Sequence, residues 1–150
     1  MATFQSDHAK RRKPTHSVDL AGIRVTTIFT YTVPATGIPT AADIIEIGTL
    51  PAFGRLVEAT IIGAGTGTAT AEVGLMNGDA GDAQAVRDLT GPRIFAAATA
   101  INNTEATTTK AAALAVNPMP ADKDTGIGVK LSAAPTAGGT ITLIATYMAD

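Results

Sequence analysis

The stretch Gly63-Ala64-Gly65-Thr66-Gly67-Thr68-Ala69-Thr70-Ala71-Glu72-Val73-Gly74 decides between two kinds of fold. Its alternating glycines resemble a phosphate-binding loop, but such a loop is followed by a helix and commonly by a lysine. Here the residues from Thr68 onward alternate small apolar and polar, which is the period of a strand. No lysine lies between Lys13 and Lys110. We therefore predict that the glycines form the turn of an antiparallel hairpin.

The same alternation recurs along the chain and predicts an all-β protein. It is clearest over residues 23–33, where Ile23, Val25, Phe29, Tyr31 and Val33 share one face. Further strands are predicted over 43–50, 55–62, 68–76, 111–116, 125–131 and 140–147, while 93–101 fits either a strand or a helix. With no tryptophan, two tyrosines and four phenylalanines, the core must consist of Ala, Val, Ile and Leu. We predict one domain, residues 21–150, an antiparallel β-sandwich or jelly roll of about eight short strands.

Residues 1–20 form a separate region, which we predict to be a flexible basic arm. They are polar, lack periodicity and contain Pro14. Residues 1–16 hold four basic residues, Lys10, Arg11, Arg12 and Lys13, against one aspartate, whereas the remainder holds 7 basic and 12 acidic residues. No aromatic residue is interleaved for base stacking, so docking on an acidic protein surface is favoured over a solvated tail and over nucleic acid.

Candidates for catalytic chemistry are few. The only histidines, His8 and His16, lie in the arm, where nothing rigid would hold them in a triad. Glu46, Glu58 and Glu72 fall on predicted polar strand faces, where a solvated carboxylate is favoured over an acid–base pair. The chain has no cysteine, so it can form neither disulfides nor cysteine-ligated zinc sites. We predict no catalytic residues, no cofactor and no enzymatic activity.

The segment Asn77-Gly78-Asp79-Ala80-Gly81-Asp82 resembles a calcium-binding loop in composition. The distal position that an EF-hand fills with a bidentate glutamate is Asp88 here, so the spacing fits poorly. A turn is the favoured interpretation, and a weak surface cation site is the alternative. No metal site is predicted.

Three segments together resemble the decoration, or cement, proteins and related head-surface proteins of tailed-bacteriophage capsids. They are residues 43–57 (DIIEIGTLPAFGRLV), residues 71–75 (AEVGL) with the Gly/Asp loop 77–82, and the closing strand 139–147 (GTITLIATY). The likeness covers roughly residues 40–150 as a pattern and leaves out the arm. None of these motifs is catalytic.

The resemblance implies a virion structural protein that binds the outer surface of the capsid and stabilises contacts between major capsid protein subunits. It also implies a homo-oligomer, commonly a trimer, that is made in the bacterial cytoplasm. Lys10, Arg11, Arg12 and Lys13 are the candidate capsid-docking residues. Two alternatives stay open, a head-fibre, tail or receptor-binding virion module and a calcium-assisted sugar-binding β-sandwich that uses Asp79 and Asp82. No transmembrane segment or signal peptide is expected, and nucleic acid is an unlikely partner.

Overall fold

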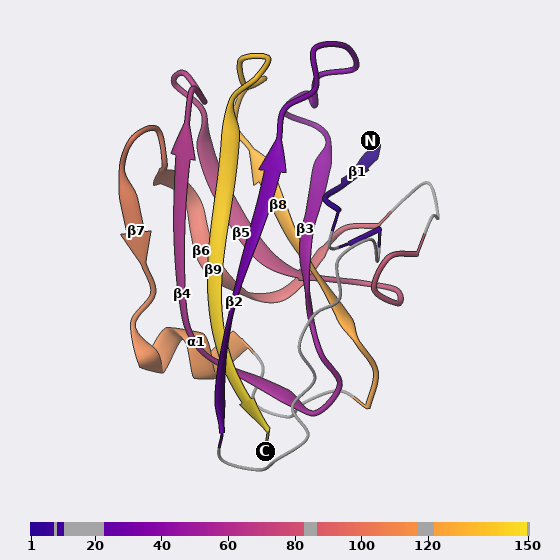
Figure 1. Ribbon diagram of the computed structural model, residues 1–150, viewed down its shortest axis with the longest axis vertical. Coiled ribbons are helices and arrows are strands. Elements are labelled where there is room, and N and C mark those ends of the chain that lie inside the picture. Colours follow the sequence, from indigo (N-terminus) through magenta and orange to yellow (C-terminus); the bar gives the residue numbers. More distant parts are fainter. Residues whose placement is uncertain (8, 11–22, 83–86, 117–121, 150) are drawn as a thin grey trace.

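The chain forms a β-sandwich (Figure 1). The computed structural model describes residues 1–7, 9–10, 23–82, 87–116 and 122–149. Within these residues it contains nine strands and one helix: β1 (Thr3–Gln5), β2 (Arg24–Thr32), β3 (Ile44–Leu50), β4 (Gly54–Ala64), β5 (Thr70–Met76), β6 (Leu89–Ala100), β7 (Glu105–Thr107), α1 (Lys110–Val116), β8 (Thr125–Leu131) and β9 (Thr140–Ala149). This confirms the predicted all-β sandwich.

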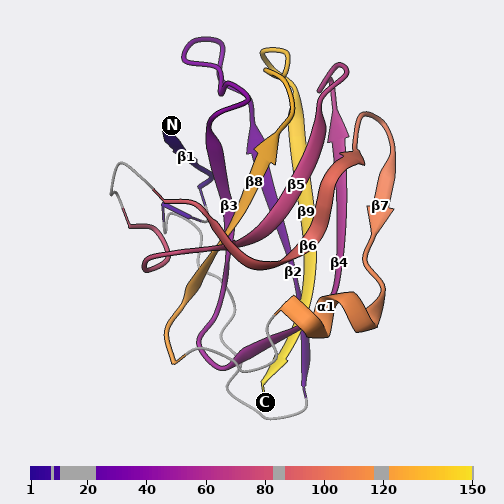
Figure 2. The ribbon, with the colours of Figure 1, turned by 180° about the vertical axis from the view of Figure 1, so that it is seen from behind.

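The strands divide into two sheets that pack face to face. The first sheet has the order β1-β3-β8-β5-β6 and the second has the order β2-β9-β4-β7. All neighbours pair antiparallel except β1 and β3, which are parallel. Seen from behind, the first sheet lies in front, with β6 crossing over at its edge (Figure 2).

The core between the sheets follows the alternation read from the sequence. In β2, Phe29 and Tyr31 are buried while Ile28 and Thr30 point outward. In β9, Ile141, Leu143, Ala145 and Tyr147 are all fully buried. On the outer face of the second sheet, threonines pair across strands: Thr26 with Thr146, Thr30 with Thr142 and Thr60 with Thr107. Many of the threonines therefore stabilise the outer face of this sheet by pairing across neighbouring strands.

The predicted hairpin at the alternating glycines is wrong. β4 pairs with β9 and β7, and β5 pairs with β8 and β6, so residues 65–69 carry the chain from one sheet to the other. Gly65 and Gly67 do have positive φ (66° and 65°), as expected for a glycine turn. Local alternation identifies a strand but says nothing about its partner, because pairing is decided by long-range packing.

The strand predicted over 111–116 is also wrong, since Lys110–Val116 is α1. The segment is rich in alanine, the residue with the highest helix propensity. Thr109 caps the helix: its hydroxyl accepts a hydrogen bond from the Ala112 N–H at 3.2 Å. Ala113 and Val116 are buried, and α1 packs against β4 and β6. The ambiguous segment 93–101, by contrast, falls almost wholly within strand β6.

Replacing Thr109 by alanine is expected to lower the free energy of unfolding by about 0.5–2 kcal/mol, because the first turn of α1 loses its side-chain acceptor. Urea unfolding followed by circular dichroism measures the change. Thr36→Ala, at an exposed loop position, is the matched control and is expected to stay within about 0.5 kcal/mol of the unchanged protein. Equal losses in the two variants would contradict the capping role.

In the part of the chain that the structure describes, no helix is long and apolar enough to cross a membrane.

Candidate functional site

The first part of the chain is bound to the sheet rather than free. β1 pairs in parallel with β3, Thr3 opposite Ile44 and Gln5 opposite Glu46. Ser6 is buried: its N–H donates to the Glu46 carbonyl at 2.9 Å, and its hydroxyl donates to the Ile47 carbonyl. β1 was not among the predicted strands, because a three-residue strand is too short to show periodicity. The rest of the predicted arm, residues 11–20, lies outside the described residues.

The candidate docking residues lie at the end of this bound segment. Lys10 is exposed and lines a shallow pocket of about 280 Å³ together with Phe4, Thr32 and Pro34. Arg11, Arg12 and Lys13 lie outside the described residues, so docking through this run stays a prediction. Both histidines, His8 and His16, fall outside them as well.

A second contact of the bound segment is to Asp43, just before β3. The carboxylate of Asp43 accepts hydrogen bonds from the Thr40 N–H at 2.8 Å, the Ala2 N–H at 2.7 Å and the Thr40 hydroxyl at 2.8 Å. These donors lower the pKa of Asp43 from its usual value near 3.8, the Thr40 N–H most strongly. They favour the ionised carboxylate, because protonation removes acceptor capacity.

Because the folded-state pKa of Asp43 is lowered, its stabilising contribution is present above pH 3.8 and is lost as the pH falls further. We therefore expect the free energy of unfolding to fall less steeply below that pH in Asp43→Asn than in the unchanged protein. Chemical unfolding at a series of acidic pH values measures this slope. Asp122→Asn, which removes an exposed carboxylate, controls for net charge. If both variants kept the unchanged protein's slope, the linkage to Asp43 would be excluded.

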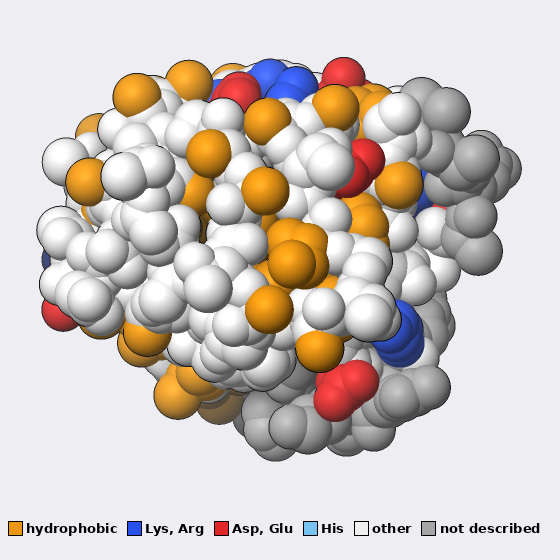
Figure 3. All heavy atoms as spheres, turned by 90° about the horizontal axis from the view of Figure 1, so that it is seen from above, with side chains coloured by type: hydrophobic (Ala, Val, Ile, Leu, Met, Phe, Trp, Pro, Cys, Tyr) orange, Lys and Arg blue, Asp and Glu red, His pale blue; other side chains and the backbone are white. Residues whose placement is uncertain are grey.

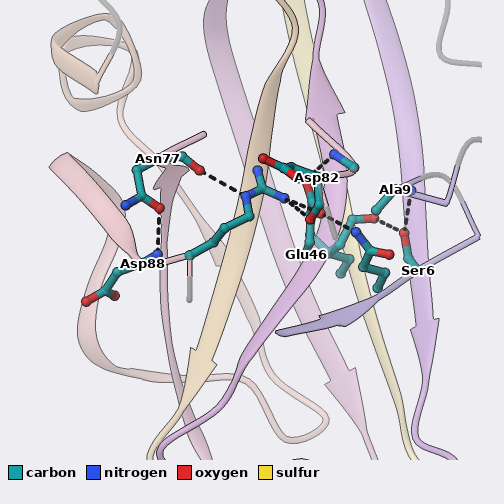
Figure 4. Close-up of polar contacts among 10 residues, drawn as sticks. Ser6, Ala9, Glu46, Asn77, Asp82 and Asp88 are labelled. Carbon is teal, nitrogen blue, oxygen red and sulfur yellow. Dashed lines mark hydrogen bonds and ion pairs between the residues drawn. The ribbon is translucent and has the colours of Figure 1, made fainter. Parts of the chain in front are cut away.

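A buried ion pair lies beneath the loop that joins β5 to β6 (Figure 4). Glu46 of β3 is fully buried and its Oε2 lies 2.6 Å from Nη1 of Arg87, whose side chain is 2% exposed. The same carboxylate accepts hydrogen bonds from Gln5 Nε2 and from the Gly81 N–H, both at 2.9 Å. Arg87 Nε donates to the Asn77 carbonyl at 2.9 Å. One buried carboxylate therefore joins β1, β3 and the β5–β6 loop.

The expectation that Glu46 is a solvated residue on a polar strand face is thus wrong. The other side of β3 from the main core is not open to water, because Ile44, Met76 and Leu89 form a second apolar cluster there. Gly126 of the neighbouring β8 leaves room for the pair: a Cβ at this position would meet both the Glu46 carboxylate and the Arg87 guanidinium. In the sequence, the one sign of this buried pair is that Gly126 stands at a strand position. A glycine there does not indicate which side chains pack against it.

The other two candidate carboxylates do not join Glu46 in an acid–base site. Glu72 is paired with Arg93, Oε1 to Nε at 2.5 Å, and both side chains are partly exposed. Glu58 is half-buried on β4, in the other sheet, next to a bulge between Leu56 and Glu58. The three carboxylates therefore lie in separate surroundings and do not form a pair.

The resemblance of 77–82 to a calcium loop is not supported by geometry. Asp79 is exposed with its carboxylate 3.7 Å from Lys123 Nζ. The Gly81 N–H points to Glu46, and Asn77 closes the loop by exchanging hydrogen bonds with Asp88. In the described ranges, no group of three His, Cys, Asp or Glu side chains is arranged to hold a metal ion. The loop covers the buried ion pair.

These features define a β-sandwich in which the Glu46–Arg87 pair and the Asp43 carboxylate hold its own segments together. No family model matches the chain, and no curated protein matches it in sequence. Among solved structures, it superposes on a protein chain of the capsid of Ralstonia phage GP4 with a TM-score of 0.84 and 30% sequence identity, covering 99% of each chain.

Two more distant chains come from the capsids of cyanophage Pam1 (TM-score 0.47, 17% identity, 93% of this chain and 96% of that chain) and Helicobacter pylori bacteriophage KHP30 (0.49, 12%, 86% and 90%). The GP4 match alone carries the assignment. The chain belongs to the family of this phage capsid protein, and it is a structural component of a phage virion rather than an enzyme.

Proposed function

We propose that the protein is a capsid decoration, or cement, protein. It binds the outer surface of the phage capsid as a homotrimer and stabilises contacts between major capsid protein subunits. The observation that carries the proposal is the likeness to a GP4 capsid chain over 99% of both chains. The described body supports it, because a compact sandwich with internally paired polar groups suits a unit that is added to a shell.

The basic run Lys10–Lys13 is the proposed electrostatic contact. The exposed position of Lys10, next to the tightly held Ser6 and Ala9, supports this role, because the run begins at a fixed point of the body. The remainder of the chain is acidic, so the run is the main positive feature that carboxylates on a shell would attract. In a trimer three such contacts act together, and each later contact is effectively intramolecular.

The proposal is tested with heads assembled in the absence of this protein. The purified protein is added, and binding is measured by co-sedimentation while the heat stability of the heads is measured by scanning calorimetry. Saturable binding over the whole head and a raised head melting temperature are expected. Gold-labelled protein found only at a vertex or on tails would overturn the proposal in favour of a fibre or tail module. Failure of heads to assemble without the protein would instead identify a shell-forming subunit.

The role of the run is tested separately with Lys10→Gln, Arg11→Gln, Arg12→Gln and Lys13→Gln combined. These substitutions leave β1, Gln5 and Ser6 in place, whereas a shortened chain beginning at Val18 would remove the contacts to β3 and the buried Glu46. Weaker binding with a flatter salt dependence is expected. Light scattering of the unchanged protein and of the fourfold variant gives the mass of each oligomer. A protein that is monomeric in solution and also binds heads as a monomer would contradict the proposed trimer.

A further inference from the structure

The strands alternate in direction, so the connections between them collect at two ends of the sandwich. One end holds the β2–β3, β4–β5, β6–β7 and β8–β9 connections, which are residues 33–43, 65–69, 101–104 and 132–139 (Figure 1). We call these four segments the loop end. All of their residues belong to the described part of the chain, and Asp43 is the one charged residue among them. Asp43 lies next to β3, and its carboxylate accepts hydrogen bonds from Thr40 and Ala2.

Such a scarcity of charge sets these exposed loops apart, since Lys, Glu, Arg and Asp are mostly found on protein surfaces. The loop end exposes chiefly Ala, Gly, Thr and Asn. Seen from above, apolar side chains are scattered over it, acidic and basic side chains are few, and most of these lie toward the margins (Figure 3). The remaining connections differ, because their described residues include Asp79, Asp82, Asp88, Asp122, Lys123 and Asp124. The charge is therefore distributed by position and not merely scarce.

The four segments of the loop end are tied to one another. Val33 and the turn at Gly138–Gly139 exchange hydrogen bonds of 2.8 and 3.0 Å. Asn102 Oδ1 accepts from the Thr66 N–H and hydroxyl, both at 3.3 Å, and the Asn103 N–H donates to the Gly63 carbonyl at 2.7 Å. Gly65 and Gly139 approach closely, since a Cβ on Gly139 would lie 2.6 Å from the Gly65 carbonyl oxygen.

This cross-linking fixes the loops before any partner arrives. A surface that is already ordered loses little conformational entropy on binding, which favours affinity. Interface centres are depleted of charged residues and surrounded by a polar rim. The loop end has both features: its centre is uncharged, and charged residues stand at its margin. They are Asp43 at the end of the β2–β3 connection, and Asp7 and Lys10, which line the same pocket as Pro34 of that connection.

We propose that the loop end is the surface by which the protein seats on the capsid shell, against an uncharged region of the major capsid protein with carboxylates beside it that receive Lys10. This inference rests on the proposed function and adds which face of the molecule meets the shell. Burying a charge without a partner is costly, so an uncharged face selects an uncharged counterpart. The long axis of the sandwich then stands on the shell.

The test adds charge at exposed loop tips, with Thr36→Glu, Thr68→Glu and Ala137→Glu combined in one variant. None of the three residues has positive φ, so the substitutions do not strain the backbone. A second variant carries lysine at the same positions. The control carries Ala111→Glu, Ala112→Glu and Ala115→Glu on exposed positions of α1, near the other end, with the same change in net charge as the glutamate variant. Melting temperatures of the free proteins verify folding.

Co-sedimentation with heads assembled without this protein gives the affinities. Both loop-end variants are expected to bind about tenfold or more weakly, and the α1 control to bind as the unchanged protein does. Unchanged binding by the loop-end variants would overturn the inference and leave the proposed function standing. Stronger binding by the lysine variant would contradict the proposal that the facing region of the major capsid protein is uncharged. If the unchanged protein failed to bind heads at all, the proposed function and this inference would both fall.

Discussion

Replacing Arg87 by alanine is expected to lower the free energy of unfolding by about 3–5 kcal/mol, because it leaves the Glu46 carboxylate buried without its cationic partner. Glu46 is fully buried and Arg87 lies 2.6 Å away. The neutral donors that remain, Gln5 Nε2 and the Gly81 N–H, do not supply the lost positive charge. At about 2–4 °C per kcal/mol for a chain of this size, the melting temperature should fall markedly.

Calorimetry and urea unfolding measure this loss, and hydrogen exchange locates it. Faster exchange is expected at the Gly81 amide and in β1, because both are held through Glu46. The matched control is Glu72→Gln, which breaks the partly exposed pair with Arg93 and should cost less than about 1 kcal/mol. The double variant Glu46→Leu with Arg87→Met should recover part of the loss, because no charge is then buried. Similar losses for Arg87→Ala and Glu72→Gln would contradict the assigned role of the pair.

Phe29→Ala is the second substitution with a large expected effect, a loss of about 3–5 kcal/mol. Phe29 is fully buried on β2. Its ring lies against Gly48 of β3 in the other sheet, where a Cβ would come within 2.5 Å of Phe29 Cγ. This contact joins the two sheets, so removing the ring leaves a cavity between them. Ile28→Ala, at a neighbouring side chain that is 58% exposed, is the control with a small expected effect.

The contact with Gly48 can be tested by a double-mutant cycle. Gly48→Ala alone is expected to cost about 1–3 kcal/mol, because the added methyl group meets the ring. In the Phe29→Ala background the same methyl group enters free space, so its cost should be much smaller. Additive losses would show that Gly48→Ala acts through the backbone and not through Phe29.

Where strands were long and one face was apolar, the sequence predicted them correctly. β2 and β9 show this best, because buried Phe29, Tyr31, Leu143 and Tyr147 alternate with outward-facing residues that are mostly threonine. The prediction failed where the signal was short or shared by two structures. β1 has three residues, and the alanine-rich α1 segment carries no strong period. In α1, helix propensity and the Thr109 cap decide the structure.

The candidate site was harder to predict than the fold. The run Lys10–Lys13 was identified from charge alone, and docking through it stays a prediction. The parallel pairing of Thr3–Gln5 with β3 was not predicted. Glu46 was read as solvated because residues 44–50 contain a polar residue at a strand position. Nothing near it in sequence indicates that Arg87, forty-one residues later, covers it. The scarcity of charged residues in these connections can be read from the sequence, but that the four segments lie together follows only from the strand directions.

The sequence by itself determined the period-two strands, the small-residue core and the turns at glycines, because these depend on a residue and its near neighbours along the chain. Only the tertiary structure decided that β4 and β5 belong to different sheets, that Glu46 is buried against Arg87, and that four nearly uncharged connections meet at one end. Each of these depends on which distant segments pack together. Pairing and burial are collective properties of the folded chain, set by the free energy of the whole core rather than by local preference.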